Sequence, residues 1–469
     1  MTSSTSKPQM TQRTQTSTLS RRRFLGQSTQ AAGAAALASV GVLCLTGSAR
    51  AAVSDYKALV CLFLSGGNDG TNLVIPLDAA RNAQYVRVRS ASGLALTGNK
   101  LMPARQAMLQ AASVAADQPF AFNAALGALD GWYGQGKVAV LLNVGSLKKP
   151  LTKAEYLAGS TIPGELFSHP DQQIQAHAGL GGGGATGWGG RLMDALGVAR
   201  GLDAVAVGTA GQFVQGASIV SNVVPERDGL SLNGMSFWPQ TEADARLLAL
   251  QKVLTANTGN RLANAANKSL ADGMALATTL KSAMATPLSA SFPATSLGAQ
   301  LRTTAQLIAA NARLGPGRQV YCVSLGGFDT HSNQAWQHAD LMSQVAAAVD
   351  AFQSAMTGAG LDRSVTLFTA SEFGRTFSPN DSGTDHGWGS TALVVGGAVK
   401  GGLYGEFPDF TLNGPDDVTG RGVWIPRLGF QQMGATLGRW FGVSAAALSS
   451  QVFPTELDQF TRKDLGFIG

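Results

Sequence analysis

Cysteine is scarce in this chain. Only three occur among 469 residues, and no pair has the short spacing of a zinc-binding motif. A cysteine framework is therefore excluded as the basis of the fold. Cys61 and Cys322 each lie within an apolar run, LVCLFL and VYCVSL, that reads as a buried strand. We expect buried free thiols at both positions, and the alternative is a disulfide between them.

Charge is also sparse, since charged residues make up 14% of the chain. The first 51 residues hold six of the 35 basic residues and none of the 29 acidic ones, so the remainder is balanced. The basic isoelectric point is thus a property of the N-terminal segment. Without a basic excess elsewhere, no nucleic-acid partner is predicted.

A long apolar run is missing as well. The most apolar stretch near the N-terminus, residues 31–45, is interrupted by glycine and serine and is short for a membrane span of about 20 residues. It follows SRRRFL at residues 20–25 and precedes Ala-Arg-Ala at 49–51, a pattern typical of a twin-arginine export signal. We therefore expect 1–51 to be a signal peptide read by the twin-arginine export machinery. The mature protein, periplasmic or secreted, would then keep no stable membrane span.

Residues 52–469 are predicted to form a single α/β domain. Apolar runs bounded by polar residues predict buried strands that alternate with helical segments, which favours a mostly parallel central sheet flanked by helices. Apolar residues recur at helical spacing between about 241 and 315, and we expect a helical subdomain inserted there. The strands expected in the sheet include residues 57–64, 137–144, 319–325, 365–370 and 391–396.

Carboxylates and histidines follow three of these strands. The chain has five histidines, and the last three lie within 56 residues in polar segments close to carboxylates. Parallel strands present their carboxyl ends at one edge, where ligands bind in open α/β sheets. Several carboxylates repel one another unless a cation neutralises them, so we predict a metal site, although each residue alone could instead cap a helix or turn. The predicted metal ligands are Asp69, Asp329, His331, Glu372 and His386.

A helix start is predicted near residue 168. Pro170 suits a first helical turn, which places Ser168 or His169 at the helix N-terminus, where main-chain amides favour an anion. His169 could orient Ser168 or bind a metal, and a loop hydrogen bond is an equal alternative. Arg375, two residues beyond Phe373, could clamp an anionic substrate, with a structural ion pair as the alternative.

Five segments in order resemble one family. They read LSGGNDGTNLVIP, LFSHPDQQ, LGGFDTHSNQ, SEFGRTFSPN and GTDHGWGS, and they span residues 64–390. The chain is similar to the exported bacterial family known as domain of unknown function 1501, which is grouped with the alkaline phosphatase–sulfatase superfamily. The resemblance implies an alkaline-phosphatase-like fold with two adjacent metals and a hydroxyl nucleophile.

Carried over to this sequence, that resemblance implies Ser168 as the nucleophile and Asp329, His331 and His386 as one metal centre. It places Glu372 with Asp69 and Ser168 at the second centre. Two departures are evident. Glu372 is followed by Phe373 where phosphatases carry Asp-His, and Asp329 and His331 are more tightly spaced than the family-wide pair. The first departure favours the alternative of a decayed site.

Three functions are consistent with the sequence. The first is an exported hydrolase of phosphate or sulfate esters that uses a divalent metal such as zinc, manganese or calcium. The second is a non-catalytic secreted binding or assembly protein of the same fold. The third is a carbohydrate- or surface-associated protein, with stacking faces offered by Trp132, Trp188, Trp336 and Trp388.

Overall fold

The computed structural model describes residues 55–103, 119–159, 161–181, 184–197, 202–219, 221–227, 234–315 and 317–469. The predicted signal peptide lies outside these residues. Within the described part, no helix is both long enough and apolar enough to cross a membrane.

A nine-stranded sheet organises the described residues, in the order β11-β5-β10-β9-β1-β8-β6-β7, with β12 also paired to β5. Every pairing in it is parallel except the two made by β10, which runs against β9 and β5. The predicted class, a mostly parallel sheet flanked by helices, is confirmed. The strands are β1 (Lys57–Leu64), β5 (Val138–Gly145), β6 (Ala204–Val207), β7 (Asn222–Val224), β8 (Arg318–Leu325), β9 (Val365–Ala370), β10 (Ser390–Gly396), β11 (Gly402–Tyr404) and β12 (Leu428–Gly429).

The central strand β1 shows why this sheet forms. Its sequence, KALVCLFL, is buried at every position after the first, as expected for a parallel strand covered on both faces. Alternate residues enter different cores: Val60 and Leu62 pack on one face, and Leu59, Cys61 and Phe63 pack on the other. Cys61 and Cys322 are buried free thiols, as expected.

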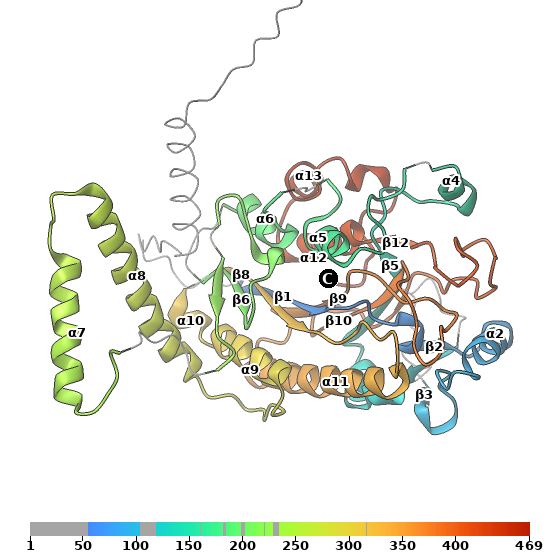
Figure 1. Cartoon of the computed structure of the whole chain (residues 1–469), viewed down its shortest axis with the longest axis horizontal. Coiled ribbons are helices and arrows are strands. Elements are labelled where there is room, and N and C mark those ends of the chain that lie inside the picture. The colour runs from blue at the N-terminus through green and yellow to red at the C-terminus, as the bar shows by residue number, and fades with distance from the viewer. Residues whose placement is uncertain are drawn as a thin grey trace, which may run out of the picture. The chain divides into compact units, whose positions relative to one another are not determined.

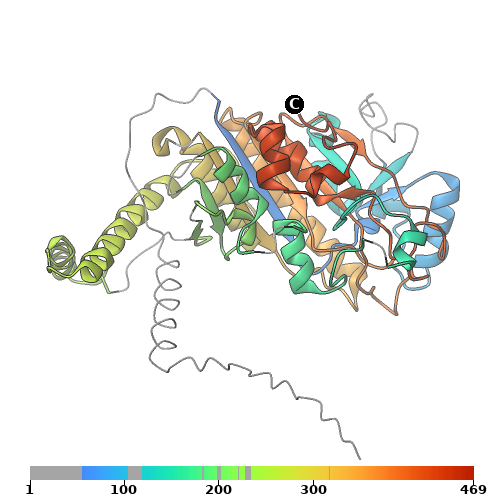
Figure 2. The same ribbon diagram turned by 90° about the horizontal axis from the view of Figure 1, so that it is seen from above.

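Helices cover both faces. One face is covered by α9 (Ser296–Ala309) and α11 (Gln334–Gly358), and the other by α5 (His169–Ala178), α6 (Trp188–Ala195) and α12 (Phe430–Phe441) (Figure 1). The view from above shows the C-terminal helices, in red, beside the blue strand β1 (Figure 2). The remaining helices are α2 (Ala79–Arg89), α3 (Asp130–Gly134), α4 (Lys153–Leu157), α7 (Gln240–Thr255), α8 (Arg261–Met284), α10 (Asn311–Leu314) and α13 (Ala445–Ala447).

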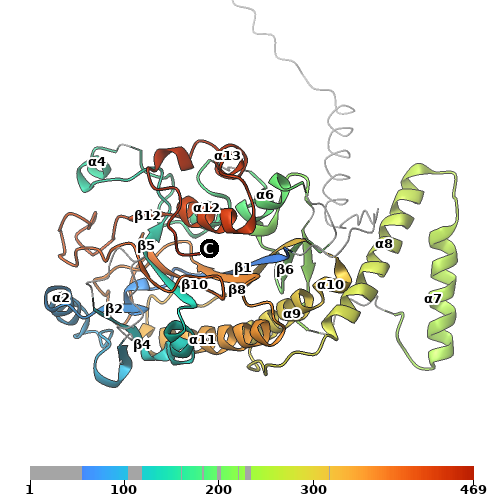
Figure 3. The same cartoon turned by 180° about the vertical axis from the view of Figure 1, so that it is seen from behind.

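Three long helices occupy the segment where a helical subdomain was expected. They differ in burial: α9 packs into the core beneath the sheet, whereas α7 buries only Ala243. Seen from behind, α7 stands beyond α8 and outside the edge of the sheet (Figure 3). A separate three-stranded sheet, not predicted from the sequence, is formed by β2 (Val74–Pro76), β3 (Leu101–Pro103) and β4 (Phe120–Asn123).

The reversed direction of β10 shapes the edge where the site lies. β9 ends at Ala370 on the carboxyl edge, and the antiparallel β10 begins at Ser390 on that same edge. The loop 371–389 therefore leaves and re-enters the sheet at one edge. It shares that edge with the segments that follow β1 and β8.

Candidate metal centre

Asp329, which follows β8, lies at the centre of a group of three histidines. Its Oδ1 is 3.0 Å from Nε2 of His331 and 3.2 Å from Nε2 of His386. Its Oδ2 is 3.5 Å from Nε2 of His169, the first residue of α5. We call Asp329, His169, His331 and His386 the histidine cluster. Its carboxylate is 44% exposed, so the cluster opens to solvent.

The three imidazoles of this cluster are held in the same way. In each ring Nδ1 lies against an oxygen that can only accept, so Nδ1 carries the proton and Nε2 keeps its lone pair. This arrangement aims the ring nitrogens of metal-binding histidines. The acceptors are Oε1 of Glu372 at 2.9 Å for His169, Oδ1 of Asp385 at 3.2 Å for His331 and the main-chain oxygen of Phe167 at 2.8 Å for His386.

The convergence of these atoms fits a cation. Nε2 of His331 and Nε2 of His386 are only 3.1 Å apart, and both face Asp329. Lone pairs and a carboxylate crowded together repel one another unless a proton or a metal ion lies between them. Ligand atoms of His169, Asp329 and His386 all lie within 4.8 Å of one another, which is close enough to share one ion.

The ionisation of the cluster also suits a metal. Burial lowers the pKa of His386, which favours the neutral imidazole. Burial alone would raise the pKa of Asp329, but hydrogen bonding and attraction to Arg375 outweigh it and lower the pKa. A neutral imidazole beside an ionised carboxylate is the protonation state that metal binding requires.

Glu372 contacts the cluster through the ring of His169. The side chain is fully buried, and Oε1 accepts hydrogen bonds from the main-chain N–H of Gly66 at 2.9 Å and from Gln173 at 3.1 Å. The same oxygen accepts from Nδ1 of His169. Glu372, predicted as a metal ligand, therefore orients the ring of His169.

Gly66 is needed for this arrangement. It has φ +122°, and an added Cβ would lie 2.3 Å from the main-chain nitrogen of Asp329. Only glycine allows the turn after β1 to approach the turn after β8 so closely.

Arg375 holds Asp329 from the inside. Its buried guanidinium donates to Oδ1 of Asp329 at 2.7 Å, to the main-chain oxygen of Gly66 at 3.2 Å and to Oγ1 of Thr384 at 3.2 Å. Nη2 also donates to the main-chain oxygen of Thr384. These contacts correspond to the structural ion pair considered for this residue.

Asp69 lies elsewhere at this edge, in a fully buried ion pair. Nη1 of Arg89, at the end of α2, donates to its Oδ2 at 2.6 Å, and Nε2 of Gln334 donates to the same oxygen at 2.5 Å. The main-chain N–H of Thr71 donates to Oδ1 at 3.2 Å. Burial would raise the pKa of Asp69, but the charge of Arg89 outweighs it and lowers the pKa. Arg89 therefore neutralises this predicted metal ligand.

Ser168 precedes α5 as predicted, at the N-cap position. Its hydroxyl donates to Oδ2 of Asp171, in the first turn of the same helix. Among the described residues, no hydrogen bond joins this hydroxyl to the histidine cluster. The structure brings Asp329, His331 and His386 together and adds His169, with Glu372 and Arg375 as their supports.

Two contributors were missing from the predicted ligand set. The sequence offers His169 only as a possible ligand, because it lies at a predicted helix start. Asp385 precedes His386 and orients His331 across the cluster. The exposed Arg421 also pairs with Asp385 and adds a positive charge beside the cluster.

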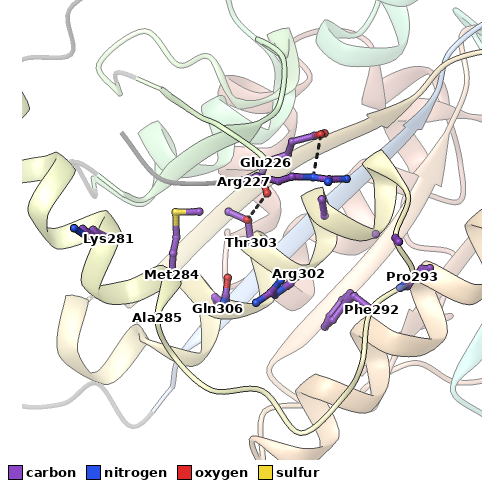
Figure 4. A pocket seen from close by; sticks show the side chains of 13 residues that line it. Glu226, Arg227, Lys281, Met284, Ala285, Phe292, Pro293, Arg302, Thr303 and Gln306 are labelled. Carbon is purple, nitrogen blue, oxygen red and sulfur yellow. Dashed lines mark hydrogen bonds and ion pairs between the residues drawn. The ribbon is translucent and has the colours of Figure 1, made fainter. Parts of the chain in front are cut away.

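A cavity of about 520 Å³ lies away from this cluster, between α8 and α9 (Figure 4). Arg227, Lys281 and Arg302 contribute to its wall, together with Glu226, which lies 3.7 Å from Arg227. None of the histidine-cluster residues lines it.

The fold and this centre define an α/β protein with a candidate metal site at the carboxyl edge of its sheet. The chain belongs to the family described as protein of unknown function DUF1501, whose model matches residues 56–421. This match confirms the family resemblance. No curated protein has a significant match to the chain.

Two solved structures are similar to the chain at low identity. One is Ps i-CgsB in complex with k-i-k-neocarrahexaose, at 8% identity and TM-score 0.34, covering 84% of this chain and 73% of the other. The other is PsFucS1 sulfatase from Pseudoalteromonas sp., at 9% identity and TM-score 0.31, covering 83% of this chain and 68% of the other. Similarity at this level carries no argument about activity.

Proposed function

We propose that the protein is a metal-dependent hydrolase of phosphate or sulfate esters, with the metal ion held by the histidine cluster. The observation that carries this proposal is the common arrangement of three imidazoles, each fixed through Nδ1 and each directing Nε2 toward Asp329. Structural ion pairs do not need three imidazoles with their lone pairs turned inward.

The donor set favours zinc among the metals considered. Imidazole suits zinc, iron and copper, whereas calcium and manganese prefer oxygen ligands. A zinc ion held here would polarise a phosphoryl or sulfuryl oxygen and make water a nucleophile near neutral pH.

The chain's own residues would position the reactants. Arg375 keeps Asp329 ionised and fixed, and Glu372 and Asp385 fix the rings of His169 and His331. The partial exposure of the cluster leaves an approach for water and for an ester. Arg421, 45% exposed, offers a positive charge to an anionic substrate.

A non-catalytic role is the second candidate, and one observation favours it. The two residues predicted for catalysis, Ser168 and Arg375, are engaged by neighbouring groups of the protein. A protein that binds a partner through its metal ion would need neither a free nucleophile nor a free clamp.

Metal content tests the proposal. We expect the purified protein to hold a stoichiometric metal ion that His331→Ala and His386→Ala both lose, because each removes a ligand. Asp340→Asn, which changes an exposed carboxylate on α11, is the matched control and should keep the metal.

An ester screen follows with the same variants. Turnover of a phosphate or sulfate ester that is lost in His331→Ala and His386→Ala would support the hydrolase. Bound metal without turnover of either ester class would leave the binding role. Absence of metal, with unchanged stability in both variants, would overturn the proposed centre.

The proposed place of action is the periplasm or the exterior. The export pattern at residues 20–25 supports this location, with the twin-arginine machinery as the partner. Replacing Arg21 and Arg22 by lysine should retain the protein in the cytoplasm, as measured by cell fractionation. Unchanged export of that variant would contradict this part of the proposal.

A further inference from the structure

A second group of metal-ligating side chains lies in the core. It consists of Cys61 on β1, Cys322 on β8 and His177 in the last turn of α5. The two sulfur atoms and an imidazole nitrogen all lie within 4.8 Å of one another. All three residues are buried. We call these three residues the thiol cluster.

The sheet brings the two thiols together. Cys61 and Cys322 are direct register partners on adjacent parallel strands, so both side chains leave the same face of the sheet. Gly211 lies against Cys322, and a Cβ added at that glycine would be 2.6 Å from its sulfur atom. The covering loop therefore fits closely over the sulfur.

Helix α5 supplies the imidazole. Positions 169, 173 and 177 are spaced by four residues and share one face of the helix. His169 and Gln173 contact Glu372, and His177 packs its ring 4.3 Å from the Phe63 ring. The same face of α5 therefore places His169 in the histidine cluster and His177 in the thiol cluster.

The ring of His177 can offer a nitrogen to an ion held by the two sulfur atoms. Among the described residues, no hydrogen bond to either ring nitrogen of His177 is present.

We propose that Cys61, Cys322 and His177 form a buried site for a thiophilic metal ion, Zn²⁺ or Cu⁺. Two sulfurs and an imidazole are ligands that both ions prefer. Binding replaces the protons of the two thiols, which are released to solvent as the metal–sulfur bonds form. Two thiolates cancel the charge of Zn²⁺, which limits the cost of burying the ion, whereas Cu⁺ would leave one negative charge.

Cobalt substitution tests the thiol cluster separately from the histidine cluster. The full chain would carry Cys44→Ala in every sample, so that only Cys61 and Cys322 contribute thiols. We expect the protein produced with Co²⁺ to show sulfur-to-metal charge-transfer absorption. That absorption should persist in His386→Ala and disappear in Cys322→Ala. The histidine cluster offers only nitrogen and oxygen ligands. The sulfur-to-metal charge-transfer absorption would therefore remain even if the histidine cluster bound no metal.

Metal analysis distinguishes the two ions. Of the protein produced with zinc and the protein reconstituted with Cu⁺, only the one that holds the preferred metal should lose one equivalent of it on Cys322→Ala. Because a core variant can misfold, the chain with an intact core is also titrated with an organomercurial. Release of one metal ion as the two thiols react would support the site. Absence of sulfur charge transfer together with metal-free thiols, or a disulfide found by mass spectrometry, would overturn it.

Discussion

Asp69 and Asp329 occupy matching places in the fold but have different surroundings. They follow β1 and β8, which are parallel neighbours, and each accepts a hydrogen bond from a buried arginine. Asp69 is fully buried, and donors from Arg89, Gln334 and Thr71 engage both of its oxygens. Asp329 is 44% exposed and faces three imidazoles.

This difference separates a carboxylate at a strand end that is a candidate metal ligand from one that is not. A single arginine neutralises a buried carboxylate, and no further cation is required there. Arg375 likewise meets the charge of Asp329, but the three imidazole lone pairs that face this open carboxylate still favour a proton or a metal ion beside it. Position at the carboxyl edge therefore identifies candidates, and the neighbouring side chains decide between them.

The largest effect is expected when the buried ion pair between Asp69 and Arg89 is broken. Arg89→Met leaves Asp69 buried without its partner, which should lower the free energy of unfolding by about 3–5 kcal/mol. Urea denaturation measures the loss, and metal content should stay unchanged. Adding Asp69→Leu to this variant should recover part of the stability. Loss of metal without loss of stability would instead place Asp69 in the metal centre.

The pH dependence of stability tests the buried surroundings of Asp69 in a second way. His338 donates to Oδ1 of Asn68 at 3.0 Å beside Asp69, and burial lowers its pKa from 6.5 to about 4. The unfolded chain therefore binds this proton at a higher pH than the folded chain. The stabilisation is complete above pH 6.5, declines as the pH falls towards 4 and is worth up to about 3 kcal/mol.

Urea denaturation at pH 7 and at pH 4.5, with a chelator present, measures this effect. His338→Gln should be less sensitive to acid than the unmodified protein. His177 contributes with the same sign and remains in both samples, so the difference between them reports His338 alone. Equal sensitivity in the two proteins would contradict the prediction.

The smallest effect concerns the supports of the histidine cluster. Glu372→Gln keeps the shape of the side chain but weakens its hold on His169, so zinc affinity should fall by about 10–100-fold. Asp385→Asn is the matched change on His331, and its effect should be at the lower end because that carboxylate is partly exposed. Competition with a chromophoric chelator measures both affinities. Unchanged affinity in Glu372→Gln would contradict its role in orienting His169.

The strands of the sheet could be read from the sequence because their signal is local. β1, β5, β8, β9 and β10 each begin and end within one residue of the expected positions, since each is a continuous apolar run. The direction of β10 could not be read, because nothing in a strand's own residues specifies the direction of its neighbour. The small sheet of β2, β3 and β4 was missed because its strands have only three or four residues.

The candidate site was predictable in part for a similar reason. His331 and His386 could be predicted as ligands because histidine is rare in this chain and carboxylates lie nearby in the sequence. The pairing of Asp69 with Arg89 depends on how α2 packs, and a residue 20 positions away gives no local sign of that contact. The burial of Glu372 likewise depends on Gly66 and Gln173, which come from two other segments.

The antiparallel course of β10 has a consequence for divergence within the family. Glu372 and His386 lie near the two ends of loop 371–389, and both ends are anchored at the same edge of the sheet. Insertions at the exposed Asp381 would lengthen the loop without separating its ends, and doubling its length would cost only about 0.6 kcal/mol. Changes in the length of this loop can thus reshape the rim while the histidine cluster keeps its place.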